Sequence, residues 1–249
     1  MPGDTCSGGE DHRYEPELLT CPTTNASEFL LYTTRTSIHR LVFGTQQDTT
    51  LPLQRLQNAL VVDYSYKSNC VFWADSHYNT LEKLCLNGSA EQTTILSEDL
   101  DTVEGLAYNW MSDQLFWVDA GKNNKIEMAR SDGSHRKTLI DQGLDKPRAI
   151  ALYPKYGFLF WSDWSDSNPR IQRAWMDGRN ITTMISGPRV HWPNGLTVDE
   201  QENRLYWTDA YLEQISYLDV FMQHPNTVLV HSAVLVPHPY SIAVYKDNV

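Results

Sequence analysis

Short apolar segments alternate with polar turns along most of the chain, and the same succession of segments returns several times. One complete succession covers the apolar segments 105–108 (GLAY) and 115–118 (LFWV), the alternating segment 125–129 (KIEMA), and 137–140 (KTLI) after a glycine turn. Each segment has the length and the residue types that are typical of a β-strand. Because helical stripes of 10–15 residues are missing from this pattern, the sequence predicts an all-β fold built from four-stranded units.

The units repeat at a nearly constant period. An aromatic-Trp-x-Asp motif begins at residues 72, 116, 160 and 206, at spacings of 44, 44 and 46. It contains Trp73 and Asp75, Trp117 and Asp119, Trp161 and Asp163, and Trp207 and Asp209. A turn glycine recurs with the motif at Gly44, Gly88, Gly133 and Gly178. Four-stranded units with a period of 40–45 residues predict a β-propeller, in which the sheets pack as blades around a channel.

The repetition also indicates what the motif residues do. The two adjacent aromatic side chains of each motif point to opposite sides of a strand, so both can be buried between neighbouring blades. The aspartate recurs once per unit, which is unusual for a catalytic acid. We interpret it as a structural group that binds backbone N–H groups at a junction between blades.

Counting the units predicts a six-bladed propeller that is incomplete in this chain. Residues 29–34 (FLLYTT) resemble a degenerate first copy, which makes five copies, and residues 239–244 (PYSIAV) open a sixth. The chain stops at Val249, where the next motif is expected. We therefore expect about five blades plus the first strand of a sixth over residues 27–249, truncated at the C-terminus. Residues 1–26 are expected to be the end of an upstream Cys-containing segment.

Composition and charge narrow the class of partner. Hydrophobic residues make up 41% of the 249 residues, which is the composition of a globular protein and not of a disordered one. Acidic residues outnumber basic ones by 31 to 20, for a net charge of −11. Such a surface repels nucleic acid and anionic lipid, so we expect neither nucleic-acid binding nor direct membrane contact. No window reaches the 18 apolar residues of a membrane span, and the N-terminus does not resemble a secretory signal.

Other features are typical of proteins that pass through the secretory pathway. The four cysteines form two local pairs, each 15 positions apart, and pairing within each is plausible. They are Cys6 with Cys21 and Cys70 with Cys85. Three sequons for N-glycosylation stand at Asn25, Asn87 and Asn180. We therefore expect this chain to be an internal piece of a larger secreted or membrane-bound protein.

The motif [YF]-W-x-D at this spacing, with P-x-[GA]-[LI]-x-[VL] 11 to 14 positions upstream, resembles the class B repeat of the low-density-lipoprotein receptor family. The resemblance covers residues 27–249 and implies a six-bladed, non-enzymatic propeller without a cofactor or metal. It implies a disulfide between Cys70 and Cys85 across two strands of one blade. It also implies a module of an endocytic or sorting receptor that binds protein partners, with neighbouring receptor modules beside it. Such a module is the lumenal or extracellular part of a single-pass membrane receptor of the plasma membrane, endosome or Golgi.

The positions that differ between units are candidates for partner binding. The residue before each inner strand varies, and these residues should ring one mouth of the channel: Asn58, Glu104, Arg148, Asn194 and Tyr240. The resemblance places partner binding on this face, where Trp164, Trp192 and Tyr211 would add apolar area. We expect an extended peptide or loop to bind here, with Asn194 supplying amide hydrogen bonds and Glu104 binding a basic group. The alternative is that these side chains only plug the channel.

Two histidines, His191 and His238, lie within three residues of that ring. Endocytic receptors release cargo near pH 5–6, the range of the ordinary imidazole pKa. We expect their protonation to weaken or redirect binding in endosomes. The alternative is that both are solvated loop residues.

Other functional classes fit the sequence less well. Six-bladed hydrolases of the gluconolactonase type hold a central divalent cation, and Asn58, Glu104 and Asn194 could imitate their ligands. Arg148 occupies an equivalent ring position, where its charge opposes a cation. A propeller of the Wnt co-receptor type is an alternative within the same family, and a cytosolic WD40-like adaptor is one outside it.

Overall fold

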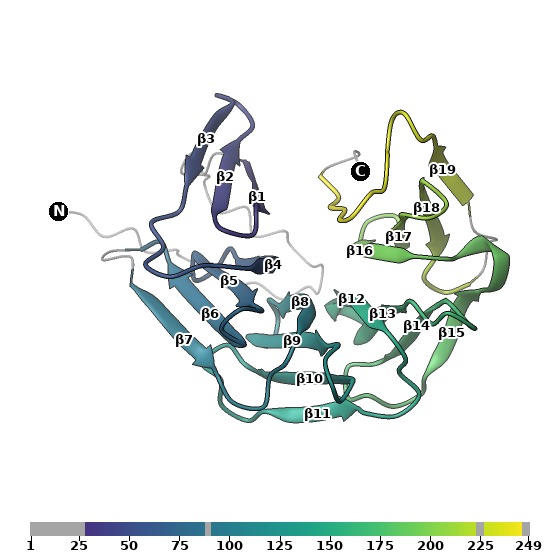
Figure 1. Cartoon of the computed structure of the whole chain (residues 1–249), viewed down its shortest axis with the longest axis horizontal. Coiled ribbons are helices and arrows are strands. Elements are labelled where there is room, and N and C mark those ends of the chain that lie inside the picture. Colours follow the sequence, from purple (N-terminus) through teal and green to yellow (C-terminus); the bar gives the residue numbers. More distant parts are fainter. Residues whose placement is uncertain (1–27, 88–90, 223–226, 246–249) are drawn as a thin grey trace, which may run out of the picture.

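The computed structural model describes residues 28–87, 91–222 and 227–245, and it consists of five antiparallel β-sheets arranged around a common centre (Figure 1). The first blade contains β1 (Phe29–Thr33), β2 (Ile38–Val42) and β3 (Gln47–Thr50). The second contains β4 (Ala59–Ser65), β5 (Cys70–Asp75), β6 (Thr80–Cys85) and β7 (Gln92–Leu96). The third contains β8 (Val103–Asn109), β9 (Gln114–Asp119), β10 (Lys125–Arg130) and β11 (Lys137–Ile140).

The last two blades repeat this plan. The fourth contains β12 (Pro147–Tyr153), β13 (Phe158–Asp163), β14 (Arg170–Trp175) and β15 (Thr182–Ser186). The fifth contains β16 (Pro193–Asp199), β17 (Arg204–Asp209), β18 (Gln214–Asp219) and β19 (Thr227–His231). The 3-10 helices η1 (Pro154–Tyr156) and η2 (Gly187–Arg189) lie in connections, and no helix among the described residues is long and apolar enough to cross a membrane.

Each four-stranded blade is a meander whose strands pair in sequence order, with the first strand nearest the channel. The hairpin between the third and fourth strands needs glycine at two equivalent positions. Gly133 and Gly178 both have φ of +85°, a left-handed conformation that side chains rarely adopt. A Cβ atom at Gly178 would also lie 2.4 Å from the carbonyl oxygen of Leu139 in the preceding blade, so the absent side chain lets two blades approach closely.

The paired aromatic residues of the motif pack against different neighbours. Trp117 belongs to a core shared with the second blade, whereas Phe116 on the opposite side of β9 belongs to a core shared with the fourth. Trp161 packs toward the third blade and Phe160 toward the fifth. The four repeated tryptophans are at most 1% exposed. Each blade therefore contributes its tryptophan to the junction with the preceding blade. The apolar core consists of separate clusters, each shared by two neighbouring blades.

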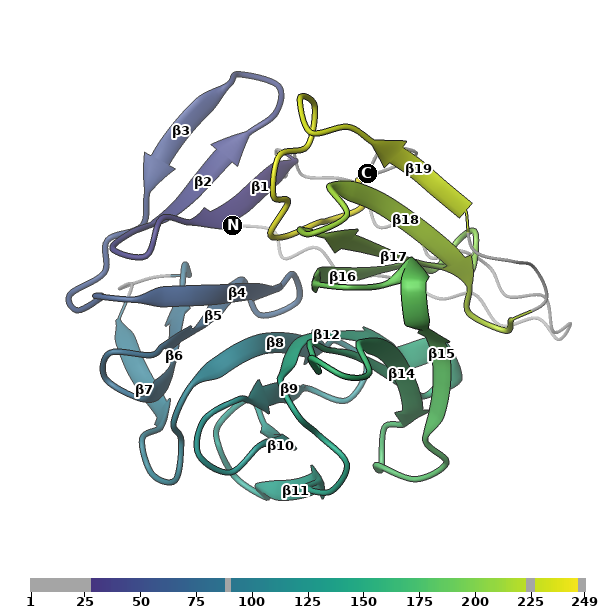
Figure 2. The ribbon, with the colours of Figure 1, turned by 45° about the vertical axis from the view of Figure 1, so that its right-hand side comes forward.

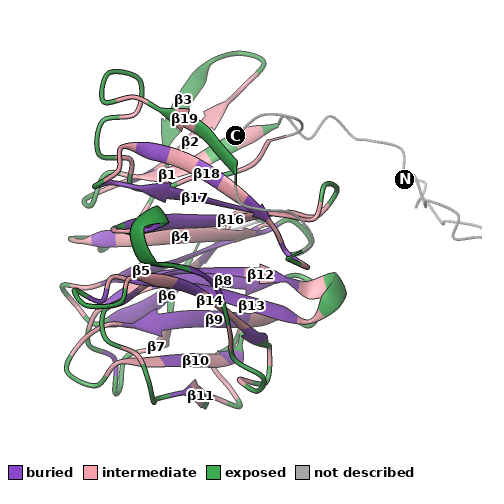
Figure 3. Ribbon diagram, turned by 90° about the vertical axis from the view of Figure 1, so that its right-hand side faces the viewer, coloured by how far each residue is buried: buried purple, intermediate pink, exposed green. Residues whose placement is uncertain are grey.

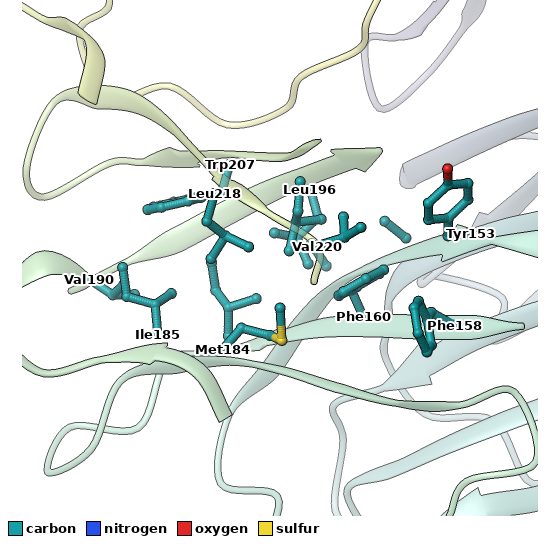
Figure 4. Packing of buried hydrophobic residues seen from close by; sticks show 14 residues of the cluster. Tyr153, Phe158, Phe160, Met184, Ile185, Val190, Leu196, Trp207, Leu218 and Val220 are labelled. Atoms are coloured by element: carbon teal, nitrogen blue, oxygen red, sulfur yellow. The ribbon is translucent and has the colours of Figure 1, made fainter. Parts of the chain in front are cut away.

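The junction between the fourth and fifth blades illustrates this packing (Figure 4). Phe158 and Phe160 of β13 and Met184 of β15 meet Trp207 of β17 and Leu218 of β18. Burial is concentrated on the inner and middle strands, while exposed residues lie on the turns and on outer strands such as β3 and β19 (Figure 3). Burying this apolar surface is the main favourable term in folding.

The first blade and the predicted sixth depart from the regular plan. The first sheet has only three strands. It lacks the innermost strand that the other blades have, so β1 itself lines the channel. Residues 239–244 were expected to form a strand, but they have no strand geometry, and among the described residues no further blade follows the fifth. This segment nevertheless passes from the fifth blade toward the first, across the open side of the ring (Figure 2).

Candidate functional site

The motif aspartates organise one face of the propeller. We call this the upper face and define it by the turns that follow each motif: 76–79, 120–124, 164–169 and 210–213. All four aspartates are at most 2% exposed, and each accepts hydrogen bonds from backbone N–H groups in the segment that enters its blade. A carboxylate that accepts several N–H groups holds a loop more firmly than neutral acceptors do. The aspartates are therefore supports of the upper face.

Asp209 accepts four of these backbone hydrogen bonds, as does Asp75. Its carboxylate accepts hydrogen bonds from the N–H groups of His191 at 2.6 Å and Trp192 at 3.0 Å, which precede β16. It also accepts N–H groups of Tyr211 at 3.2 Å and Leu212 at 3.1 Å in the following turn. One buried carboxylate thus fixes two loops of the upper face relative to each other.

A central cavity of about 690 Å³ is lined by the inner strands, β1 and residues 240–243. Four of the five predicted ring residues line it: Glu104, Arg148, Asn194 and Tyr240. Asn58 is not among its lining residues. Its side-chain amide instead donates a hydrogen bond to the hydroxyl of Ser76 at 2.6 Å, and so joins two loops of its own blade.

Arg148 lies at the centre of the contacts around this mouth. Its guanidinium carbon is 4.0 Å from the ring centroid of Trp164 and 5.2 Å from that of Tyr240, distances typical of cation–π contacts. Its Nη1 atom is 3.4 Å from Oε2 of Glu104. Neither that oxygen nor the Arg148 Nε atom has a hydrogen-bond partner within the described part of the chain. Burial raises the pKa of the Tyr240 phenol, and the positive charge of Arg148 opposes this rise.

Asn194 is the most deeply buried member of the ring, with 6% of its surface exposed. Its Nδ2 atom donates to the carbonyl oxygen of Pro239 at 2.8 Å, which joins β16 to the segment that follows β19. Its Oδ1 atom has no hydrogen-bond partner in any described residue. A buried acceptor without a partner costs free energy, so a group that donates a hydrogen bond to it would be bound favourably.

Three of the predicted aromatic residues form one continuous surface beside the mouth, which we call the aromatic shelf. Trp164 and Trp192 are stacked with ring centroids 5.8 Å apart, and Tyr211 meets Trp192 edge-on at 5.3 Å. Trp192 is 41% exposed and Tyr211 is 55% exposed. The indole N–H of Trp164 donates to the carbonyl oxygen of Pro193 at 3.0 Å, which fixes the inner end of the shelf.

Both predicted histidines contact the turn that carries Tyr211. The His191 ring meets the Tyr211 ring edge-on, with centroids 3.9 Å apart. The Nδ1 atom of His238 lies 3.2 Å from the carbonyl oxygen of Ala210, so this nitrogen carries the proton of a hydrogen bond. His238 has φ of +47°, an uncommon left-handed conformation for a non-glycine residue.

The remaining predicted residues lie away from the upper face. Cys70 and Cys85 form a disulfide between the paired strands β5 and β6. Asn87 and Asn180 are exposed in turns at the opposite end of the blades, the lower face. Cys6, Cys21 and Asn25 lie outside the described residues. Within the described ranges, no group of three or more His, Cys, Asp or Glu side chains is arranged to hold a metal ion.

Several charged groups at the blade junctions were not predicted from the sequence. Glu82 and Glu127 are 2% and 3% exposed, and each pairs with an arginine, Arg55 at 2.9 Å and Arg136 at 2.6 Å. The signal was available, because these glutamates stand 45 positions apart in the third strand of consecutive blades. The fourth and fifth blades have Gln172 and Ser216 at the equivalent positions.

Asp63 was also missed. It lies in β4 at the lower end of the channel wall and accepts hydrogen bonds from the backbone N–H groups of Tyr108 at 2.6 Å and Tyr64 at 2.7 Å. The bond to Tyr108 joins the second blade to the third. Burial raises the pKa of the Asp63 carboxyl to about 6, although both N–H bonds favour the charged form.

Comparison with known sequences places the repeats in a family. Residues 113–154 and 157–200 match the family described as low-density lipoprotein receptor repeat class B. The sortilin-related receptor of Mus musculus is 57% identical over 248 residues, which cover 99% of this chain and 11% of the receptor. The low-density lipoprotein receptor-related protein 5 of Homo sapiens is 44% identical over 238 residues, which cover 94% of this chain and 14% of that protein. Within the family, segments 69–75 and 192–196 of this sequence resemble the sortilin-related receptor, and the 57% identity to the Mus musculus receptor confirms this resemblance.

Comparison with solved structures agrees with the fold. A chain in the crystal structure of a nidogen/laminin complex superposes with a TM-score of 0.79 at 29% identity, covering 87% of this chain and 82% of that chain. A gluconolactonase from Xanthomonas campestris superposes with a TM-score of 0.68 at 16% identity, covering 87% of this chain and 75% of that chain. The second likeness shows the propeller fold alone.

Proposed function

Since the chain belongs to the low-density lipoprotein receptor class B repeat family, we propose that it is a partner-binding module in the ectodomain of an endocytic or sorting receptor. The partner is an extracellular or lumenal protein that docks on the upper face. The chain spans only 11% of the sortilin-related receptor of Mus musculus, so the activity of a whole receptor reaches beyond this module. The similar chain in the nidogen/laminin crystal structure belongs to a protein complex, which supports a binding role.

The unpartnered Oδ1 atom of Asn194 carries the proposal. Asn194 lies in the wall of the cavity, two positions after the exposed Trp192 in the sequence. A chain that places an N–H donor against Asn194 would satisfy a buried polar atom and cover an exposed indole at the same time. Glu104, at the same mouth, would accept a basic group of the partner. An extended peptide or loop fits this arrangement, because it could reach Asn194 in the cavity and cover the aromatic shelf beside it.

The alternative reading, in which the ring side chains only plug the channel, accounts for part of the geometry. Asn194 does bind Pro239, and Arg148 does fill space between Trp164 and Tyr240. A plug would not require Trp192 and Tyr211 to remain exposed beyond the channel mouth. Exposed, fixed aromatic side chains are characteristic of binding hot spots.

The test is selection of a displayed library of constrained loops and linear peptides on the folded chain. Selected sequences should bind the wild-type chain and lose at least about tenfold in affinity on Trp192→Ala and on Asn194→Ala. Trp175→Ala is the matched control, because Trp175 is 41% exposed like Trp192 but lies on the lower face and does not line the cavity. Peptides that bind all variants equally, or that lose affinity only with the control, would show that the upper face is not the binding surface.

We further propose that acid weakens or redirects this binding. His191 touches Tyr211 of the aromatic shelf, and His238 binds the carbonyl oxygen of Ala210 beside it. Protonation of either ring adds a positive charge to a mouth that already contains Arg148. Affinity measured for one selected peptide should fall between pH 7.4 and pH 5.5, and His191→Gln with His238→Gln should remove most of that fall. A pH dependence that survives both substitutions would assign the effect to other groups.

The location and extent of the module are part of the same proposal. We place it in the lumenal or extracellular part of a single-pass receptor, where the Cys70–Cys85 disulfide is stable. The propeller occupies residues 27–249, residues 1–26 end an upstream Cys-containing segment, and neighbouring receptor modules adjoin it. Mass spectrometry of the intact secreted protein tests the disulfide assignments, including Cys6 with Cys21.

A hydrolase function is not supported by the geometry of the mouth. Arg148 is held there by Trp164 and Tyr240, so a fixed positive charge stands where a divalent cation would bind. Members of the class B repeat family serve receptors as binding domains, and we propose that this chain is not an enzyme.

A further inference from the structure

An exposed aromatic side chain and a glycosylation sequon lie together on the lower face of the fourth blade. Trp175, the last residue of β14, is 41% exposed, and Ile181 beyond the turn is 47% exposed. The sequon Asn180-Ile-Thr182 stands at the far side of the same hairpin. Both exposed apolar side chains belong to the hairpin that carries the sequon.

The hairpin holds Trp175 and Asn180 near each other. The N–H of Trp175 donates to the carbonyl oxygen of Arg179 at 2.9 Å, and the N–H of Gly178 donates to the carbonyl oxygen of Trp175 at 2.8 Å. Asn180 directly follows Arg179, whose carbonyl oxygen binds Trp175, so Asn180 and Trp175 lie close together across the hairpin. Its φ of +59° is a left-handed conformation that asparagine adopts more readily than most residues.

Trp175 is fixed as well as exposed. Its ring stacks on Phe158 of the neighbouring strand, with centroids 4.9 Å apart and planes at 29°. Phe158 in turn contacts Phe221 of the fifth blade at 6.2 Å and lies under the guanidinium group of Arg173 at 4.4 Å. An aromatic ring held from one side presents its remaining surface as a rigid platform. The polarised C–H groups of a sugar ring pack favourably on such a surface, because an aromatic face carries negative charge density.

The side chain of Asn180 is free to carry a glycan without the loss of a hydrogen bond. No hydrogen bond joins its amide to any other described residue. Asn87 differs, since its Oδ1 atom accepts from Asn69 at 2.7 Å and its Nδ2 atom donates to the carbonyl oxygen of Ser68 at 3.2 Å. The two described sequons thus differ in their surroundings, and only Asn180 follows an exposed tryptophan across a hairpin.

We infer that Asn180 carries an N-linked glycan whose first N-acetylglucosamine packs on Trp175 and covers it. In the attachment step a bond forms between Nδ2 of Asn180 and the anomeric carbon of the sugar. The bond from that carbon to a lipid diphosphate donor breaks, the diphosphate leaves with the bonding electrons, and one amide proton passes to solvent. Sequon glycosylation is a known modification of surface loops. The contact between this sugar and Trp175 is the new element, and it rests on the proposed passage of the chain through the secretory pathway.

The contact between the first sugar and Trp175 should be more favourable than the same contact with a free sugar, because it forms within one molecule. A sugar tethered next to the indole has a high effective concentration and loses little further freedom on packing. Covering Trp175 removes apolar surface from water, which adds to the free energy of unfolding. Glycosylated protein should therefore melt about 2–4 °C higher than the protein without this glycan.

The test uses the full chain secreted from cells that attach N-glycans. Peptide mass spectrometry should find Asn180 occupied. Hydroxyl-radical labelling should then oxidise Trp175 severalfold more slowly in the glycosylated chain than in the Asn180→Gln variant. Protection should persist after enzymatic trimming of the glycan to a single N-acetylglucosamine, because only the first sugar makes the contact. Trp110, which is 58% exposed, is the internal control and should be oxidised at the same rate throughout.

Stability provides a second readout. The drop in melting temperature caused by Asn180→Gln should be smaller in a Trp175→Leu background than in the wild-type background, whereas any drop caused by Asn87→Gln should be the same in both backgrounds. Equal oxidation of Trp175 with and without the sugar, or an unoccupied Asn180 beside an occupied Asn87, would overturn the inference. Absence of glycan from both sites would instead contradict the proposed passage through the secretory pathway, and the inference with it.

Discussion

Arg148 lies with its guanidinium carbon 4.0 Å above the ring of Trp164, and at the same mouth it is 3.4 Å from the carboxylate of Glu104. Arg148 and Glu104 are 21% and 17% exposed at their side chains, so little water reaches either charge. The pair therefore holds the centre of the upper face, and its removal should have consequences for stability as well as binding.

Removing Arg148 should destabilise the fold through the partner it leaves behind. Arg148→Ala leaves the half-buried Glu104 carboxylate without a counter-charge, at a cost of about 1–3 kcal/mol in the free energy of unfolding. The double variant Arg148→Ala with Glu104→Gln should recover part of this loss, because no uncompensated charge remains. Urea unfolding of the wild type, both single variants and the double variant measures the coupling. Strict additivity of the two single changes would mean that the pair does not interact.

Substituting Asp209 should release the loops of the upper face. Asp209→Asn exchanges a charged acceptor of four backbone N–H groups for a neutral one that also brings a donor, and we expect a loss of about 2–3 kcal/mol. Asp119 is a matched comparison, because hydrogen bonds reach it from the N–H groups of Asp101 and Thr102. Asp119→Asn should cost less. Hydrogen exchange should also become faster at Trp192 in the Asp209 variant and stay unchanged there in the Asp119 variant.

The Asp63 carboxyl should make the fold more stable in mild acid. Burial raises its pKa to about 6 from an ordinary value of 3.8, so the folded chain holds this proton more tightly than the unfolded chain does. The resulting stabilisation is complete below about pH 4 and is lost as the pH rises through about 6. Across this range the free energy of unfolding should change by no more than about 3 kcal/mol.

Asp63→Asn isolates this effect, since asparagine does not titrate. The difference in free energy of unfolding between the wild type and this variant should shift in favour of the wild type between pH 7.5 and pH 5. Because other groups titrate identically in both proteins, only the difference is informative. A difference that stays constant over this range would show that the carboxyl titrates near its ordinary value.

Breaking the disulfide should lower stability without changing the architecture. Cys70 and Cys85 enclose 15 positions of chain, and closing a loop of this length contributes about 3 kcal/mol through the unfolded state. The strands β5 and β6 pair over their whole length, so the hairpin should still form in Cys70→Ser with Cys85→Ser. Thermal melting together with circular dichroism should reveal a lower midpoint and an unchanged spectrum. A changed spectrum would mean that the disulfide is needed to form the blade.

The period of the Trp-x-Asp motif was enough to predict the blades, because each tryptophan must be buried at a junction and each junction looks alike. The same periodicity predicted four of the cavity-lining residues. It failed for Asn58, because a ring position in sequence does not say whether a side chain turns toward the channel or toward a neighbouring loop such as that of Ser76. It also failed for the segment 239–244, because an apolar pattern does not determine whether a segment pairs with a neighbouring strand.

The groups that sequence analysis missed share a physical cause. Asp63, Glu82 and Glu127 are charged residues on strands, where a periodic pattern predicts solvent exposure. Their burial depends on specific partners. Asp63 accepts from Tyr108 of the next blade, Glu82 pairs with Arg55 27 positions away, and Glu127 pairs with Arg136 nine positions away in the same blade. Pairings of this kind become visible only when the junctions between blades are known.

The last described residue also meets the beginning of the ring. Tyr245 hydrogen-bonds Glu28, 217 positions earlier, and its ring packs on Phe43 with centroids 4.5 Å apart. Contacts between such distant positions form late, because a long loop must close first. Blades should therefore assemble in order during synthesis, each on its predecessor, and the step that joins Tyr245 to the first blade should be the slow one. Time-resolved refolding should reveal a final phase that Tyr245→Ala alters while the earlier phases keep their rates.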